Sequence, residues 1–389
     1  MRKYLSFIGL AAIVISACNK TEESLGVRNQ TPLLPTTEFN YSEQVFSADI
    51  QFIANGQLFN VTDARATLGR VLFYDTKLSV NNAISCGSCH KQNVAFADMT
   101  RFSNGFRGVK TTRNSPTTFN AGMNDSYFWD RRATTLTDQV LMPAFDHVEM
   151  GMSDINALVS KIRSIDYYAP LFEKAYGNEI SPDILVTESK VRLAISNFLR
   201  SMLSLNSKFD QNNRGESLVG LEAEGRILFA TKARCGSCHG GRNFGNWGAA
   251  NIGLEMDYAD KGIAAWSQGV PEGIFKIPTM RNIALTAPYM HDGRLATLDE
   301  VIEHYNSGIL AHPGLDSRLW KNVPEDWGFN PEETLTFPGI TPTSVSDIEP
   351  ARLGLTQHEK VALKAFLLTL TDYSLINDPK FSDPFVYQK

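Results

Sequence analysis

The sequence is poor in cysteine, with only five among 389 residues. It also lacks an excess of positive charge: 37 basic and 42 acidic side chains leave a net charge of −5, which argues against a nucleic-acid partner. The alternation of apolar and polar residues that is typical of half-buried strands is scarce. These scarcities predict a mainly α protein in which the position of each cysteine is informative.

Four of the five cysteines lie in two copies of one pentapeptide, Cys86-Gly87-Ser88-Cys89-His90 and Cys235-Gly236-Ser237-Cys238-His239. This pattern is the attachment signature of c-type haem, in which two thiols bind the porphyrin and the histidine binds the iron. A zinc site made from both cysteine pairs would leave the two histidines unused. A redox Cys-x-x-Cys motif would not be expected to recur with the same two residues between its cysteines. The sequence therefore predicts two covalently bound haem c groups, with His90 and His239 as iron ligands.

The surroundings of the two motifs are also related. Gly69-Arg70-Val71-Leu72-Phe73 precedes the first motif, and Gly225-Arg226-Ile227-Leu228-Phe229 precedes the second. An internal repeat of this kind predicts two cytochrome-c-like haem domains related by internal duplication, within a mainly α fold that has long loops. We place the N-terminal haem domain at residues 41–206 and the C-terminal haem domain at residues 207–375.

The N-terminus is typical of an exported protein. Two basic residues precede an apolar run at 5–15, which is short for a membrane span and suits a secretory signal. The ending Ile15-Ser16-Ala17-Cys18 resembles a bacterial lipobox, in which cleavage leaves Cys18 as the lipidated first residue; a plain cleaved signal with an incidental cysteine is the alternative. We therefore predict a lipoprotein-type signal peptide at 1–18, a flexible tether at 19–40, and a periplasmic location with a lipid anchor as the only membrane attachment.

Beyond the haem motifs, the sequence from about residue 62 to 371 resembles the bacterial di-haem cytochrome c peroxidase family. The resemblance is carried by the segments 68–75, 113–117, 128–130, 148–150, 278–282 and 287–293, together with Gln139. It implies an enzyme that reduces hydrogen peroxide to water at the N-terminal haem. Electrons from a small cytochrome c, or another periplasmic donor, would enter through the C-terminal haem. A homodimer is compatible with the resemblance, because members of the family are often dimers.

The resemblance also implies catalytic residues. Glu149 would lie on the distal face of the first haem, with Gln139 nearby, and a buried carboxylate there moves a proton between the two oxygens of peroxide. Trp129 would lie between the haems and pass oxidising equivalents. Without the resemblance, Glu149 would be interpreted as an exposed charged residue in a loop, and Trp129 as an ordinary packed aromatic residue.

A calcium ion between the haems is a further implication of the resemblance. Asn114 and the backbone carbonyls of Thr286 and Pro288 resemble the family's calcium site, and ligation by oxygen alone suits this ion. The resemblance leaves His291 to steady a haem propionate or a loop. The other histidines, His147, His312 and His358, are expected to be structural or exposed.

One departure from the family pattern concerns the first haem. Many members carry a histidine seven residues before the arginine of the segment 113–117, where it ligates the resting haem until reduction displaces it. Here that position is Phe106, and the loop 103–110 contains no histidine. We therefore expect a first haem that is open to peroxide without reductive activation, with His147 as the first candidate for an unexpected ligand.

The second departure concerns the other haem. Fourteen residues after His291, where the peroxidase branch has a methionine ligand, this chain has Tyr305. Tyr305 falls near the centre of an apolar helix face, so we predict that it is the sixth iron ligand opposite His239. Met290 is the rival ligand, and a core tyrosine that donates a hydrogen bond is the alternative. Compared with a neutral thioether, a phenolate ligand stabilises ferric iron and higher oxidation states of iron. A tyrosine ligand at this position is the feature that links the chain to the MauG type.

Three functions therefore remain. The leading prediction is a peroxidase that reduces hydrogen peroxide. The first alternative is a MauG-type di-haem enzyme that uses peroxide to oxidise residues of a partner protein. The second alternative is a non-enzymatic di-haem electron carrier, which the absence of a sixth ligand near Phe106 and the presence of Glu149 both disfavour.

Overall fold

The computed structural model describes residues 28–43, 61–177, 182–215, 217–245, 248–321 and 348–386. The predicted signal peptide with Cys18, and residues 19–27 of the predicted tether, lie outside this set. Among the residues described, no helix is both long and apolar enough to cross a membrane.

The prediction of a mainly α fold is confirmed. The helices are α2 (Asp63–Tyr74), α3 (Cys86–Cys89), α4 (Leu136–Gln139), α5 (Met142–Phe145), α6 (Ile155–Arg163), α7 (Tyr168–Tyr176), α8 (Pro182–Leu185), α9 (Glu188–Ser201), α10 (Lys208–Asn212), α11 (Leu221–Ala230), α12 (Leu298–Glu303) and α13 (Gln357–Leu368). Within the described ranges the strands are two residues long each, β1 (Ala249–Ala250) and β2 (Phe275–Lys276), and they pair antiparallel. Long loops connect these elements.

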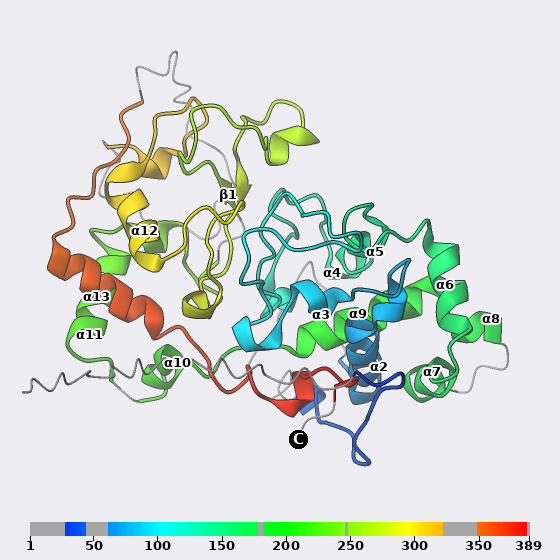
Figure 1. Cartoon of the computed structure of the whole chain (residues 1–389). Coiled ribbons are helices and arrows are strands. Elements are labelled where there is room, and N and C mark those ends of the chain that lie inside the picture. Colours follow the sequence, from blue (N-terminus) through cyan, green and yellow to red (C-terminus); the bar gives the residue numbers. More distant parts are fainter. Residues whose placement is uncertain are drawn as a thin grey trace, which may run out of the picture.

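Two lobes lie beside each other, and each is built on a pair of packed helices (Figure 1). In the N-terminal lobe α2 packs on α9, and in the C-terminal lobe α11 packs on α13. Thr62 and Thr187 cap the first pair, and Thr356 caps α13 with a capping box. Each cap satisfies an amide at the helix start, so the sequence sets where these helices begin.

Each helix pair meets at a glycine. A Cβ atom added to Gly69 would lie 2.0 Å from the carbonyl oxygen of Ala194, and one added to Gly225 would lie 2.0 Å from that of Ala362. No residue other than glycine allows two helix backbones to approach this closely. The glycines of the two repeated pentapeptides therefore perform the same packing task in each lobe.

Aromatic rings fill the space beside both crossings. The rings of Phe73 and Phe198 lie 5.5 Å apart between centroids in the N-terminal lobe, and those of Phe229 and Phe366 lie 5.2 Å apart in the C-terminal lobe. Both pairs meet edge to face, the geometry that aromatic quadrupoles favour. The same kind of core thus supports both haem motifs.

The two ends of the described chain lie together against the N-terminal lobe (Figure 1). The amides of Asn29 and Leu33 donate to the carbonyl oxygens of Phe385 and Pro384, both at 2.7 Å. Phe385 is itself buried in the core of this lobe. Residues 28–33, part of the segment predicted to be a tether, are therefore held along the lobe by the C-terminal segment.

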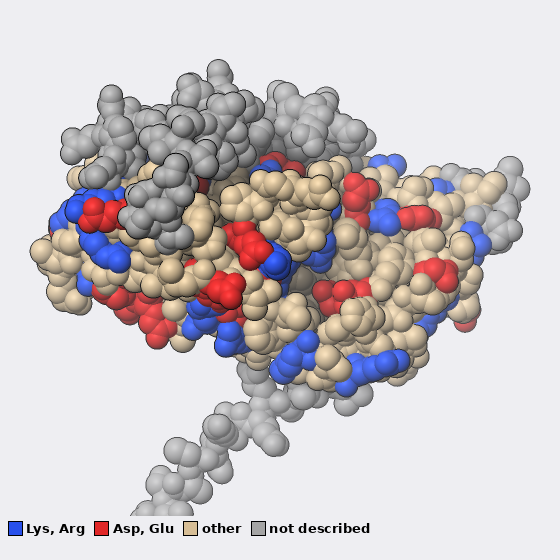
Figure 2. Space-filling view, turned by 90° about the horizontal axis from the view of Figure 1, so that it is seen from above, with Lys and Arg blue, Asp and Glu red and all other residues tan. Residues whose placement is uncertain are grey.

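Charge of one sign does not dominate the face of the molecule shown in Figure 2. Basic and acidic side chains alternate across both lobes there, in agreement with a net charge close to balance. The described part of this face therefore provides no broad single-sign field for steering a highly charged partner.

Gly69→Ala should destabilise the N-terminal lobe, because the new methyl group overlaps the backbone of α9. We expect a loss of about 2 kcal/mol or more in the free energy of unfolding, measured by urea titration of the holoprotein. Gly248→Ala is the matched control, since a Cβ there meets only the flexible end of Ile277 at 3.4 Å. Equal unfolding midpoints for the two variants would contradict the packing argument.

Candidate functional site

Each Cys-x-x-Cys-His motif lies in the wall of a large cavity. The first cavity is lined by Cys86, Cys89 and His90, and the second by Cys235, Cys238 and His239. Their empty volumes, open mouths included, are about 1790 Å³ and about 1570 Å³. Because each space is lined by both cysteines and the histidine of one motif, each is the candidate site for one haem group.

The two motif histidines are oriented in the same way. The Nδ1–H of His90 donates to the carbonyl oxygen of Phe96 at 2.9 Å, and that of His239 donates to the carbonyl oxygen of Phe244 at 3.1 Å. A carbonyl can only accept, so Nδ1 carries the proton and Nε2 keeps its lone pair. Metal-bound histidines are held by this kind of outer bond, and both residues are therefore ready to bind iron through Nε2.

A partly buried cation completes the fit of haem to the second cavity. Lys276 lines this cavity, and burial lowers the pKa of its ammonium group to about 8. Within the described residues, no carboxylate forms an ion pair with it. Haem carries two propionate groups, and an anion beside Lys276 would offset the cost of burying its charge. Two thiols, a preset histidine and this cation fit a covalent haem c.

The two cavities have equivalent helices in their walls, as well as equivalent haem motifs. A short capped helix begins after Thr135 in one lobe and after Thr297 in the other, 162 positions apart. The first cavity is lined by Leu136, Gln139, Val140 and Pro143, and the second at the same spacing by Leu298, Val301, Ile302 and Tyr305. The last position differs in chemistry: proline has no side-chain donor atom for a metal, whereas tyrosine has a phenolic oxygen.

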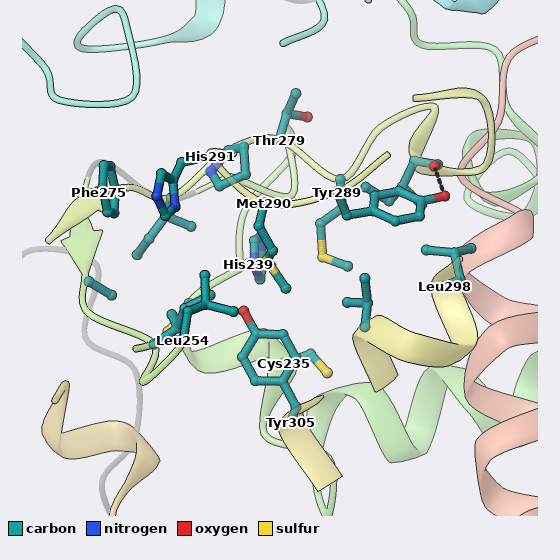
Figure 3. A pocket seen from close by; sticks show the side chains of 18 of the residues that line it. Cys235, His239, Leu254, Phe275, Thr279, Tyr289, Met290, His291, Leu298 and Tyr305 are labelled. Carbon is teal, nitrogen blue, oxygen red and sulfur yellow. Dashed lines mark hydrogen bonds between the residues drawn. The ribbon is translucent and has the colours of Figure 1, made fainter. Parts of the chain in front are cut away.

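The ring of Tyr305 points into the second cavity, which His239 also lines (Figure 3). Its hydroxyl makes no hydrogen bond to any described residue. Burial raises the pKa of Tyr305 above its ordinary value. A core tyrosine normally finds a hydrogen-bond partner, so the alternative of a merely structural tyrosine has no acceptor here. Met290, the rival ligand, lines the same cavity.

Glu149 lines the first cavity together with Gln139 and His147. Burial, followed by the nearby charge of Asp146, raises the pKa of Glu149 to about 7, although Arg132 opposes the shift. In the described part of the chain, no residue donates a hydrogen bond to its carboxylate. Glu149 is therefore a partly buried group that exchanges protons near neutral pH, unlike the exposed loop charge of the alternative interpretation.

Phe106 lies beside this acid without lining the cavity. Its amide donates to the carbonyl oxygen of Glu149 at 3.0 Å, and its ring packs over Gly151. The carbonyl oxygen of Phe106 accepts from the side chain of Asn81 at 2.8 Å. These contacts hold the histidine-free loop in place, with a ring at position 106 that has no atom able to bind iron.

Trp129 and Asn114 line both cavities and so form a common wall. The indole N–H of Trp129 donates to the backbone oxygen of Asn114 at 2.9 Å, and the amide of Asn114 donates to the carbonyl oxygen of His291 at 2.8 Å. Thr286 and Pro288 line the second cavity. The structure thus brings the three predicted calcium ligands to one cavity and places Trp129 between the two haem motifs.

Sequence reasoning missed three features of these walls. It did not identify Pro143, although the 162-residue spacing of the capping threonines would have revealed it. It did not identify Lys276, an isolated lysine for which no pattern exists. It did not identify the partner of His291, whose imidazole stacks on Phe275 with ring centroids 3.8 Å apart and an interplanar angle of 12° (Figure 3).

Comparisons with known proteins agree with this geometry. The family described as "Di-haem cytochrome c peroxidase" matches residues 63–218. Methylamine utilization protein MauG of Methylorubrum extorquens is 33% identical over 263 residues, which cover 67% of this chain and 73% of that protein. Cytochrome c551 peroxidase of Nitrosomonas europaea is 34% identical over 246 residues, which cover 61% of this chain and 71% of that protein.

Solved structures support the same assignment. A MauG-like protein associated with microbial copper homeostasis matches with a TM-score of 0.69 and 33% identity, over 84% of this chain and 94% of that chain. The diheme peroxidase BthA from Burkholderia thailandensis, at 21% identity and a TM-score of 0.64 over 87% of this chain and 94% of that chain, shares the fold. From the two haem motifs, their matched cavities and these relatives, we conclude that the chain belongs to the di-haem cytochrome c peroxidase family.

Proposed function

We propose that this protein reduces hydrogen peroxide to water at its N-terminal haem and receives electrons through its C-terminal haem. One observation carries the proposal: matched wall positions hold Pro143 in the first cavity and Tyr305 in the second. The first cavity therefore offers peroxide a free site beside a proton-exchanging acid, whereas the second offers the iron a side-chain ligand.

Haem, when bound, supplies the iron that activates peroxide and stores its oxidising equivalents. Glu149 performs the proton transfer in this proposal. The Glu149 carboxylate accepts a proton from one oxygen of hydrogen peroxide and donates it to the other oxygen, which then leaves as water. Gln139, on the same wall, orients the substrate by hydrogen bonding. The balance is one peroxide, two protons and two electrons for two molecules of water.

Trp129 is the proposed route between the haems. It lines both cavities, and its indole N–H is fixed on the backbone of Asn114. An oxidisable ring held in a single position suits repeated electron transfer. The donor is a small cytochrome c or another periplasmic reductant in this proposal, and a homodimer remains part of it by analogy with the family.

A calcium ion is proposed beside this route. The side-chain oxygen of Asn114, with the backbone oxygens of Thr286 and Pro288, would supply oxygen ligands at the wall of the second cavity. The Asn114 side chain donates through Nδ2 to the carbonyl oxygens of Thr100 and Arg101, at 3.2 and 3.4 Å. Because Nδ2 faces these two carbonyl oxygens, the side-chain oxygen Oδ1 of Asn114 points away from them and is available to bind a cation.

The MauG-type reaction, oxidation of residues on a partner protein, is the second candidate. The phenolic ligand proposed at Tyr305 favours it, because a phenolate stabilises highly oxidised iron more than a thioether does. The similarity to MauG proteins supports it about as strongly as the similarity to peroxidases supports the first candidate. Peroxide turnover with reduced cytochrome c separates the two: fast turnover supports the peroxidase, and a long-lived oxidised state with slow turnover supports the MauG-type enzyme.

We further infer two duplicated haem domains, at 41–206 and 207–375. The inference is supported by the matched glycine crossings at Gly69 and Gly225, and by the matched cavity walls. Export, with the signal at 1–18, the segment 19–40 and a lipid on Cys18, completes the proposal, since haem is attached to such motifs outside the bacterial cytoplasm.

Glu149→Gln should keep both haems but slow peroxide cleavage on the order of a hundredfold, because it removes a positioned acid–base group. In the parent, the stopped-flow rate should rise with pH through about 7, where the Glu149 carboxylate forms, and this rise should vanish in the variant. Asp146→Asn is the matched control. It keeps the oxygen that accepts from the Glu149 amide but removes a negative charge, so the midpoint should move to lower pH. A parent-like rate in Glu149→Gln would contradict the proton-transfer role.

Tyr305→Phe should change the spectrum of only one haem. We expect a high-spin electron resonance signal from the first haem in both proteins, and a low-spin signal from the second haem that shifts or disappears in the variant. Met290→Leu serves as the control and should leave both signals unchanged. A methionine–iron charge-transfer band in the near infrared would instead assign Met290 as the ligand, and low-spin signals from both haems would contradict the open first site.

Trp129→Phe should spare peroxide cleavage at the first haem and slow electron sharing with the second. The reason is that phenylalanine fills the wall but is much harder to oxidise than indole. Rapid mixing with peroxide, followed at wavelengths where the second haem absorbs, measures the transfer. Unchanged kinetics of the second haem would show that electrons take another path.

A further inference from the structure

One main-chain hydrogen bond occurs at equivalent positions in the two lobes. In the first lobe the amide of Met152 donates to the carbonyl oxygen of Ala144 at 2.9 Å. In the second lobe the amide of Leu353 donates to the carbonyl oxygen of Asn306 at 3.0 Å. Ala144 and Asn306 are 162 positions apart, which is also the spacing of the two capping threonines. Each residue therefore directly follows the matched wall position of its own cavity.

Between these bonded residues the two lobes differ in length and in chemistry. The first lobe has the short segment 145–151, which carries Glu149 into the wall of the first cavity. The second lobe has the long segment 307–352. Its described part forms a cluster of three buried apolar residues, against which Tyr305 packs: Ile309, Leu315 and Ile348. At equivalent places, one lobe thus has an acid in its cavity wall and the other has an apolar support for Tyr305.

Asn306 joins this long segment to the helical turn that carries Tyr305. Asn306 is only 8% exposed. Its Oδ1 accepts from the amide of Leu355 at 2.8 Å, and its Nδ2 donates to the carboxylate of Glu303 at 3.2 Å. Together with the main-chain bond described above, three hydrogen bonds converge on the residue next to Tyr305 in the sequence. Ala144, at the equivalent position of the first lobe, has no side-chain atom that could form two of them.

The turn that contains Tyr305 is also unusual. Helix α12 continues into a π-helix, η7 (His304–Gly308), a rare conformation that often occurs at functional sites. The Nε2–H of His304 donates to the carbonyl oxygen of Ile252 at 2.9 Å, and its ring meets that of Tyr305 edge to face with centroids 5.2 Å apart. The ring of Tyr305 is therefore held by His304 and by the apolar cluster, while its hydroxyl lies in the second cavity (Figure 3).

We propose that Asn306 is a positioning residue, which keeps the phenol of Tyr305 in the cavity that His239 lines. The proposal rests on the proposed role of Tyr305 as an iron ligand, and it adds what holds that ligand in place. Without the side chain of Asn306, the buried amide of Leu355 loses its acceptor, and the chain must move to regain one. A phenol that leaves the cavity for part of the time gives external ligands access to the iron for that fraction of the time.

The experiment compares imidazole binding to each ferric haem in Asn306→Ala and in the parent holoprotein, followed by absorption and electron resonance. Imidazole is the probe because it is a small neutral ligand of iron. In the parent, the second haem should bind it far more weakly than the first, since Tyr305 occupies that iron. In the variant, the affinity of the second haem should rise on the order of tenfold, whereas that of the first should stay unchanged.

Asn197→Ala is the matched control. Asn197 is fully buried, its Oδ1 accepts from the amide of Thr62 at 3.2 Å, and it lines neither cavity. The substitution should lower the free energy of unfolding but leave imidazole binding at both haems like that of the parent. Asn306→Asp is a milder second variant, because it keeps the oxygen that accepts from Leu355. It should raise the affinity of the second haem less than Asn306→Ala does, and it carries the test if the alanine variant fails to retain both haems.

The outcomes separate this proposal from the ligand assignment on which it rests. If imidazole binds the second haem of Tyr305→Phe but not that of the Asn306 variants, the positioning role is overturned and the ligand assignment stands. An equal rise in affinity in Asn306→Ala and Asn197→Ala would reveal general loosening of the fold and would also overturn the positioning role. A second-haem signal that does not change in Tyr305→Phe would refute the ligand itself, and the positioning role with it.

Discussion

The contact of a glycine with the backbone of a facing helix is the constraint on which both lobes depend. At Gly69 and at Gly225 there is no room for a methyl group, so α2 and α11 lie directly against α9 and α13. The end of α2 then meets the haem loop, where the ring of Tyr74 packs over Gly87. A shift of the helix pair would therefore move the motif cysteines and the histidine that the iron requires. The position of the haem-attachment motif therefore depends on how closely the two helix backbones approach each other.

On this shared framework the two sites differ in a few side chains. The proline in one wall and the tyrosine in the other occupy matched positions after matched helix caps. Glu149 adds an acid with a pKa near neutrality to the site whose wall offers no ligand at this position. In the proposed function, catalysis and electron storage are therefore separated by local substitutions rather than by different folds. This is the physical basis for assigning different roles to two haems that are attached in the same way.

The two cavities share a narrow wall. Trp129 and Asn114 belong to both cavity walls, and the loop that ends at Lys276 closes over the far side of Trp129 through main-chain and ion-pair contacts. The proposed electron transfer through Trp129 would require rigidity here, because electron transfer depends steeply on distance and a mobile indole would transfer slowly. The partly buried ion pairs of Arg113 hold that loop against the N-terminal lobe. The same contacts leave Trp266 exposed at the outer edge.

The sequence by itself determined the mainly α class and the haem-attachment motifs, because these depend on local spacing and on contiguous residues. Resemblance to the family pointed to Glu149, Gln139 and Trp129, and the structure brings all three to the walls of the first cavity. Only the tertiary structure decided the environment of these groups. A pKa depends on burial and on neighbours such as Asp146, which periodicity does not reveal. The tertiary structure also showed Lys276 beside the second cavity, and Pro143 in the first cavity at the position that corresponds to Tyr305 in the second. It further showed Trp266 hydrogen-bonded to the backbone of Asp130, next to the inter-haem wall. These relations join residues far apart in the chain, and the physical reason is that packing, rather than local propensity, sets the distance between them.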